Sequence, residues 1–219
     1  MNYYTIDWDY SNLTVIGHYP QTTFKKGYDP SLPNGFWQIN PNEFPNFSPH
    51  LELTIHKKAN PTDFIQRNVN FGMIISKNFK RILCQFNLPP YKLYPICVFH
   101  KGKQLEYYWF HFIVTSFFSQ LDKTISKASI YNIKKIPNEP VSNIDLSLDL
   151  EQLKEIDASL PWYQEIKWEQ LSFTNSFPQY DVYETQLFDF NTLISERLLS
   201  TLLNEGMNGF TYKLYDKIR

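Results

Sequence analysis

The sequence predicts an α+β fold, in which a few helices pack on a mostly antiparallel sheet. Three observations favour this class. One helix-then-strand pattern occurs twice, one region has the form of a clear β-hairpin, and aromatic residues make up 17% of the 219 residues. Aromatic side chains favour strands and fill the core beneath them, so we expect an aromatic-rich sheet.

The repeated pattern covers residues 75–94 and 194–215. Each copy contains an apolar residue, a serine, an amphipathic stretch, a short break and the sequence Tyr-Lys-Leu-Tyr. Ser76 and Ser195 are suited to begin the helices, because a serine oxygen can accept a free N–H of the first helical turn. The shared Tyr-Lys-Leu-Tyr predicts that a strand follows each helix and that the copies form two related helix-strand units.

The expected helices run from Ser76 to Phe86 and from Ser195 to Asn204. Prolines at positions 89 and 90 end the first, and glycines at positions 206 and 209 end the second. Their apolar residues recur at the spacing of one helix face, which should pack on the sheet. These residues are Phe79, Ile82, Leu83 and Phe86 in the first helix, and Leu198, Leu199, Leu202 and Leu203 in the second.

The elements before the first copy are predicted from local composition. Residues 3–16 are β-prone at both ends and predict a strand or hairpin. Residues 17–50 are rich in proline and glycine and predict a long loop segment that also carries aromatic side chains. Residues 51–55 alternate between apolar and polar side chains and predict a strand, whereas residues 61–65 predict a short turn or helix.

The elements after it are a hairpin, a short helix and later strands. The hairpin is expected over 94–99 and 105–114, and its second strand is apolar on both faces, which places it in the centre of the sheet. An acidic helix is indicated by the spacing of Leu150, Leu153 and Ile156 before Pro161. Strands are plausible over 166–174 and 182–190.

We expect a single domain over residues 1–219. Residues 1–50 supply an N-terminal strand and the proline-rich loop segment, and residues 51–219 supply the core with both helix-strand units. The length is sufficient for a substantial core. The segment most suited to a domain boundary is 134–149, the weakest joint of the chain, because it combines prolines with acidic residues.

Composition narrows the class of protein. The formal net charge of -1 shows no global bias toward nucleic acid or an anionic membrane, so neither is an expected partner. The start has no basic and apolar regions of a signal peptide, and the apolar stretch 105–118 is too short to span a bilayer. A cytoplasmic protein is the simplest interpretation.

The two cysteines, Cys84 and Cys97, have no metal-binding spacing and are expected to be buried free thiols.

The motifs of common catalytic sites are absent from the sequence. It contains no glycine-rich phosphate loop, no His-Glu-x-x-His and no Gly-x-Ser-x-Gly. No two of the five histidines have the spacing of metal ligands, and His111 is expected to be a core histidine. We therefore assign no catalytic, cofactor-binding or metal-binding residues and expect no cofactor.

The order of short motifs resembles an immunity-protein family of bacterial polymorphic toxin systems, formerly catalogued as a domain of unknown function. The resemblance extends over nearly the whole chain. Its departures include the longer proline-rich segment at 17–50 and Pro89-Pro90 in place of a glycine break. The matching segments are Met1–Tyr4, Asp63-Phe64, Ile74–Phe79, the aromatic strand 107–114 with Asp122, and Leu193–Leu198 with Gly206-x-x-Gly209-Phe210.

The resemblance implies a non-catalytic immunity protein that binds and neutralises a cognate toxin. The alternative is a small enzyme or ligand-binding protein whose site is assembled from distant residues. That alternative predicts a deep pocket with converging polar groups and shifted ionisation.

Two surfaces are candidates for contact with the partner. The first is the 17–50 segment, because it departs most from the family pattern and its aromatic side chains Tyr28, Phe36 and Trp37 are of the kind enriched at binding hot spots. These side chains could instead anchor the loop to the core. The second is the acidic group Asp145, Asp149, Glu151, Glu155 and Asp157, which could attract a basic nuclease-type toxin.

Overall fold

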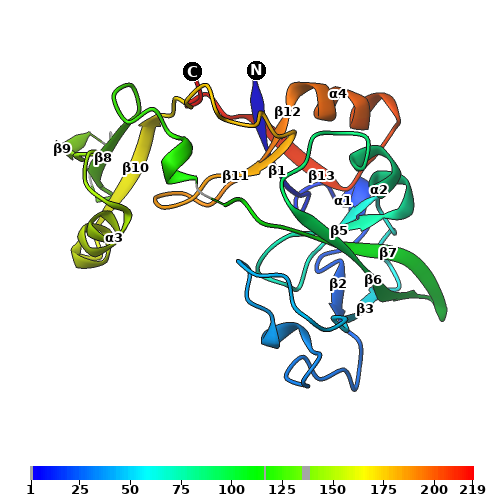
Figure 1. Ribbon diagram of the computed structural model, residues 1–219. Helices are drawn as coiled ribbons and strands as arrows, with labels where there is room; N and C mark the ends of the chain where they lie inside the picture. The colour runs from blue at the N-terminus through cyan, green and yellow to red at the C-terminus, as the bar shows by residue number, and fades with distance from the viewer. Residues whose placement is uncertain (1, 116, 135–138) are drawn as a thin grey trace.

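The computed structural model describes residues 2–115, 117–134 and 139–219 and confirms the α+β class, with mostly antiparallel sheets. A main body holds both predicted units, and a smaller lobe projects from it (Figure 1). The elements are β1 (Tyr3–Trp8), α1 (Leu13–Ile16), β2 (Thr22–Phe24), η1 (Phe36–Gln38), β3 (Glu52–Ile55), β4 (Phe64–Ile65), β5 (Met73–Ser76), α2 (Lys77–Leu83), β6 (Tyr91–His100), β7 (Lys103–Phe112), η2 (Phe118–Gln120), β8 (Lys127–Asn132), β9 (Pro140–Asn143), α3 (Leu150–Ser159), β10 (Gln164–Gln170), β11 (Val182–Glu184), β12 (Thr192–Ser195), α4 (Glu196–Asn204) and β13 (Phe210–Leu214).

The described strands form three sheets. The six-stranded sheet has the order β2-β3-β6-β7-β5-β4, the four-stranded sheet has the order β11-β12-β1-β13, and a three-stranded sheet, β10-β8-β9, belongs to the small lobe. All pairs are antiparallel except β3 with β6. Strand β7 is paired on both sides, as its two apolar faces predict, and Trp109 and Phe110 are fully buried on opposite faces.

The two predicted helix-strand units are both present, and their likeness extends further than the sequence repeat. The order β4-β5-β7-β6 in one sheet corresponds to β11-β12-β1-β13 in the other. In both units the N-capping serine ends one strand and is paired with the first residue of a Tyr-Tyr pair. Ser76 is opposite Tyr107 in β7, and Ser195 is opposite Tyr3 in β1.

Contacts between the two units are reciprocal. Asn87, after α2, donates its backbone N–H to the Asp181 carboxylate of the second unit at 2.8 Å. Asn208, after α4, donates its backbone N–H to the Asp63 carboxylate of the first unit at 3.3 Å. Helices α2 and α4 also contact each other, and their leucines are sealed in the core, with Leu83 and Leu202 both at 0% exposure.

The 17–50 segment covers one face of the six-stranded sheet. Its 3₁₀ turn η1 buries Phe36 against Trp109, with ring centroids 5.6 Å apart. His111, in β7, is buried as expected and donates from Nε2 to the carbonyl of Pro41 at 2.9 Å. Trp109 and His111 of the central strand β7 therefore anchor this segment to the sheet.

The small lobe consists of β8, β9, β10 and α3, inserted between β7 and β11 (Figure 1). Asp149 caps α3 by accepting the Gln152 N–H at 2.9 Å, and Gln152 Oε1 accepts the Asp149 N–H in return. The Trp168 side chain and Leu153 lie in a core that continues into the main body. The predicted joint at 134–149 falls partly on residues 135–138, which are outside the described residues.

Four local predictions are wrong. The strands expected over 166–174 and 182–190 end at Gln170 and Glu184. Residues 13–16 form the single helical turn α1 and not a strand, because Asn12 caps the turn and Gly17 closes it with a positive φ of 76°. Residues 64–65 form strand β4, since they pair with β5. Cys84 is exposed and Cys97 is half-buried, because Cys84 follows the last turn of α2 and faces away from the core. Across the described residues, no helix is long and apolar enough to cross a membrane.

Candidate binding cleft

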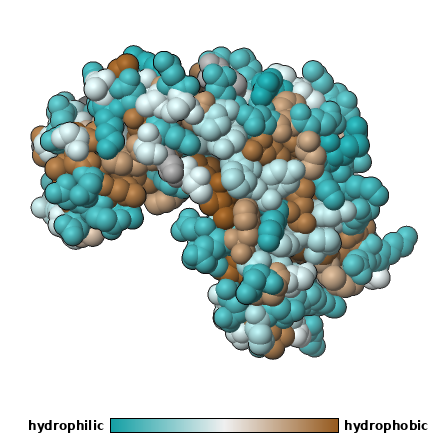
Figure 2. All heavy atoms as spheres, viewed as in Figure 1, coloured by the Kyte–Doolittle hydropathy of each residue, from teal (hydrophilic) through white to brown (hydrophobic). Residues whose placement is uncertain are grey.

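A cleft of about 880 Å³ separates the small lobe from the main body. Figure 2 shows it as a deep notch that is open to solvent and has apolar residues along its inner surface. The volume lies in the range of small-molecule and cofactor pockets, about 300–1,000 Å³. Most of the wall is apolar, and a few charged and amide side chains enter it.

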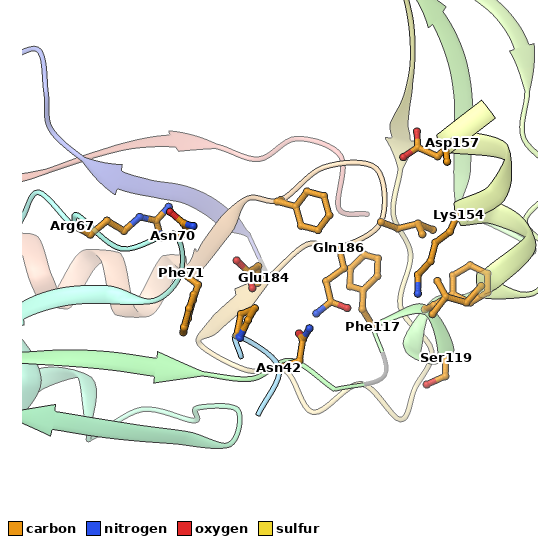
Figure 3. Close-up of a pocket in the computed structure, with 16 residues that line it drawn as sticks. Asn42, Arg67, Asn70, Phe71, Phe117, Ser119, Lys154, Asp157, Glu184 and Gln186 are labelled. Atoms are coloured by element: carbon orange, nitrogen blue, oxygen red, sulfur yellow. The ribbon is translucent and has the colours of Figure 1, made fainter. Parts of the chain in front are cut away.

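The main-body wall comes from two neighbouring segments. The β4–β5 loop supplies Arg67, Asn70 and Phe71, and the end of β11 supplies Glu184. Figure 3 shows these four side chains together on one side of the cleft. Phe71 is held from behind by His111, whose ring centroid lies 4.8 Å away, so the central strand supports this wall.

The opposite wall belongs to the small lobe. Helix α3 presents Lys154 and Asp157, and the segment around η2 presents Phe117 (Figure 3). Phe118 of the same segment also lines the cleft. Phe117 is buried and packs on Trp168 with centroids 6.1 Å apart. This wall is therefore continuous with the core of the lobe.

The β11–β12 loop forms the floor between the walls, and Gln186 ties it to both of them. The Gln186 side chain donates from Nε2 to the Val114 carbonyl at 2.9 Å, and its backbone carbonyl accepts from Trp168 Nε1 at 3.2 Å. Leu187, which lines the cleft, has a φ of 78°, a left-handed conformation rarely adopted by a branched side chain. Such backbone strain is concentrated at functional sites.

The basic and acidic side chains of the cleft differ in their hydrogen-bond partners. Arg67 donates from Nη1 to the Gly72 carbonyl at 2.8 Å, and Lys154 donates to Glu151 at 2.8 Å. Within the described residues, the carboxylates of Glu184 and Asp157 receive no hydrogen bond and form no ion pair. Burial raises the pKa of both carboxyl groups, and nearby Arg67 partly offsets this for the pKa of Glu184.

The three aromatic residues predicted to bind a partner lie outside the cleft and differ in exposure. Phe36 is buried, and Tyr28 is half-buried and donates its hydroxyl to the His50 carbonyl at 2.7 Å. Trp37 is 66% exposed. The anchoring interpretation thus describes Phe36 and Tyr28, and Trp37 presents its ring to solvent.

Small parts of the two predicted surfaces nevertheless reach the cleft. The 17–50 segment contributes Pro41 and Asn42 to the cleft, and the acidic group contributes Asp157 from α3. Sequence reasoning did not identify Arg67 or Glu184, because neither belongs to a spaced motif. The one available signal is that Glu184 directly follows Val182 and Tyr183 in a predicted strand.

Among the described residues, no group of three or more histidine, cysteine, aspartate or glutamate side chains is arranged to hold a metal ion. No protein-family profile matches the chain, and no curated protein shows significant similarity to it.

Proposed function

We propose that this protein is a non-catalytic binding protein that neutralises a cognate bacterial toxin in the cytoplasm, and that a segment of the toxin enters the cleft between the two lobes. The toxin is proposed from the sequence resemblance. The cleft is the observation that supports the place of binding.

The shape and lining of the cleft fit a protein segment. The cleft is open along one side (Figure 2), and Phe190 at its edge is 75% exposed. Large exposed aromatic side chains beside an apolar groove are typical of protein interfaces. Because the floor is tied to both lobes through Gln186, the site is formed before a partner binds, which limits the entropy lost on association.

The test is co-expression with the product of the adjacent gene, in which this proposal expects a toxin domain. We expect growth rescue and co-purification of the two chains. Hydrogen exchange of the complex should then show protection in the β4–β5 loop, α3 and the β11–β12 loop. Full toxicity despite soluble expression, with no complex detected, would contradict the proposal for that partner.

A second candidate is a small-molecule-binding protein or enzyme that uses the same cleft. The raised pKa of Glu184 in a mostly apolar site favours it, because perturbed carboxyl groups are common at active sites. A thermal-shift screen of metabolites separates the candidates. A compound that stabilises the wild type but not Glu184→Gln would support the second one.

A further inference from the structure

We infer that the outer edge of strand β13 is a docking surface for the same strand of a second copy of this chain, so that the four-stranded sheets of two copies join into one continuous sheet. Strand β13 forms one end of its sheet, and β11, which contributes Glu184 to the cleft, forms the other. The inference goes beyond the proposed function, since a dimer formed at β13 carries two clefts at its far ends.

The first argument is the direction of the backbone groups of β13. Antiparallel strands exchange hydrogen bonds at every second residue. Tyr215 donates its N–H to the Tyr3 carbonyl at 2.9 Å, and the pairing continues in register, which directs the odd-numbered residues of β13 to β1. The N–H and C=O groups of Phe210, Tyr212 and Leu214 therefore point away from the sheet. Among the described residues, none forms a hydrogen bond with these outward groups.

The second argument is the lack of protection along this edge. Natural edge strands are kept short, interrupted by proline or bulges, or loaded with charge. Among the other edge strands of the described sheets, β2, β4 and β11 have only two or three residues. Strand β9 begins with Pro140, and the pairing of both β9 and β10 has a register irregularity. Strand β13 instead runs for five residues in continuous register with β1 and carries one charged residue, Lys213.

The third argument is the exposure of the side chains on β13. Residues 211–214 are all exposed, so both faces of the sheet are open to solvent at this edge. Tyr212 and Leu214 lie on the same face and are 45% and 49% exposed. The ring of Tyr4 in β1 lies beside them, with its centroid 6.2 Å from that of Tyr212. An exposed apolar row on an unpaired strand favours association with another strand.

The first helix-strand unit shows that this side of the sheet can accept a further strand. Strand β6 occupies the place in its sheet that β13 occupies in the other. The outer edge of β6 is paired with β3, which lies outside the four strands that the two units share. The chain supplies no corresponding strand for β13 among the described residues.

A second copy fits the edge because β13 is complementary to itself about Tyr212. A two-fold axis at this position pairs the two strands antiparallel, with Tyr212 opposite Tyr212 of the second copy and Leu214 opposite Phe210. The outward backbone groups then bond one another, and the apolar side chains meet on one face of the joined sheet. On the other face, Lys213 is opposite Thr211, so no like charges meet.

The two neighbouring positions of the axis are less favourable. An axis at Lys213 would place two lysines directly opposite each other, which destabilises a strand pair. An axis at Thr211 would require the Asn208 carbonyl to bond the second copy, but this carbonyl already accepts the Phe64 N–H at 3.0 Å. The pairing is therefore expected about Tyr212.

Sedimentation velocity of the full chain is the first test. We expect a monomer–dimer equilibrium that shifts by mass action between about 1 µM and 500 µM. Tyr212→Lys should weaken the dimer at least about tenfold, because two cations would then face each other across the axis. Val141→Lys is the control, since Val141 is a similarly exposed apolar residue of another edge strand, β9, and it should leave the dimer unchanged. Thermal melts check that both variants are folded.

Amide hydrogen exchange then locates the contact. The N–H groups of Tyr212 and Leu214 should exchange at least about tenfold more slowly in the dimer than in the dilute monomer, whereas the Lys213 N–H, directed to β1, should be protected in both. A chain that stays monomeric, a dimer that Tyr212→Lys leaves intact, or a dimer with these two amides unprotected would overturn the inference. Protection of the two amides only after addition of the product of the adjacent gene would also overturn it, because the edge would then accept a strand of another protein.

Discussion

Asp63 and Asp181 lie at equivalent positions of the two helix-strand units, and each accepts the hydroxyl hydrogen of the serine that caps its own helix. Ser76 donates to Asp63 at 2.6 Å, and Ser195 donates to Asp181. Each serine oxygen also accepts a backbone N–H of the first helical turn, from Phe79 or Leu198, at 3.2 Å. Each serine side chain thus joins the start of its helix to the residue just before the edge strand of its unit, β4 or β11.

The two equivalents differ in burial, which predicts unequal effects of removing the serines. Asp181 is fully buried and also binds Arg197, whereas Asp63 is only partly buried. Ser76→Ala should lower the free energy of unfolding by about 1 kcal/mol, the usual cost of a lost cap. Ser195→Ala should cost about 2–4 kcal/mol, since it also removes a donor from a buried carboxylate. Urea denaturation measures both, with the exposed Ser200→Ala as control. Equal losses would contradict the role given to Asp181.

Two adjacent leucines of α4 separate core packing from helix propensity. Leu202 is fully buried between the units, and Leu203 is 44% exposed. Leu202→Ala should destabilise the protein by about 2–5 kcal/mol, as other large-to-small changes in a core do. Leu203→Ala should change the stability by less than about 1 kcal/mol. Thermal and urea unfolding of both variants checks the assignment, which would be wrong if both melted like the wild type.

The loop after α4 contains a matched pair of glycines. Both have positive φ, but a Cβ at Gly209 would lie 2.2 Å from the Phe64 carbonyl oxygen, whereas a Cβ at Gly206 would meet nothing within 4 Å. Gly206→Ala should cost about 1–2 kcal/mol from its left-handed backbone alone. Gly209→Ala should cost about 3 kcal/mol or more, because the overlap adds to the backbone strain. A smaller loss at Gly209 than at Gly206, measured by urea denaturation, would refute the close contact between the units.

Local rules predict the parts of this fold that depend on neighbouring residues. The serine caps follow from spacing within a dozen residues, and the structure confirms them. The predicted helix faces are confirmed except at their ends, because α2 stops at Leu83, before Phe86, and Leu203 of α4 is exposed. The equivalence of β1 and β7 is harder to predict. Strand β1 precedes the rest of its unit by most of the chain, whereas β7 directly follows β6 of its own unit. The signal available was the Tyr-Tyr pair, Tyr3-Tyr4 and Tyr107-Tyr108. The hydroxyls of Tyr3 and Tyr107 even bond equivalent carbonyls, those of Tyr180 and Thr62.

Local rules do not predict the cleft. Its walls come from the β4–β5 loop, α3, the β11–β12 loop and the 17–50 segment, which only the tertiary fold brings together. The sequence favoured Trp37 and the acidic group because aromatic content and charge clusters are visible without a structure. A single unpaired carboxylate such as Glu184 has no such pattern, since its importance depends on what surrounds it.

The ionisation of Glu184 predicts a pH-dependent gain of stability on substitution. Burial raises its folded-state pKa above the ordinary value of 4.5, so the folded state binds the proton more tightly than the unfolded state does. Below the ordinary pKa this preference stabilises the fold, and the benefit is lost as the pH rises through the folded-state pKa. Glu184→Gln should therefore be more stable than the wild type at neutral pH, and the difference should shrink as the pH falls toward 4.5. Chemical denaturation between pH 7 and pH 4 measures it. A difference that does not change with pH would contradict this account.

Two aromatic residues with the same exposure distinguish the cleft from the rest of the surface. Phe190 and Trp162 are both 75% exposed, but only Phe190 lines the cleft, while Trp162 lies on the small lobe beside Lys134. Because each ring is mostly in solvent, neither alanine variant should change the melting temperature noticeably. In the complex with the toxin domain, Phe190→Ala should weaken binding by about tenfold to a hundredfold, as expected for an aromatic anchor. Trp162→Ala should bind like the wild type. Trp37→Ala completes the comparison, since a large effect there with none at Phe190 would move the interface from the cleft to the outer face of the 17–50 segment.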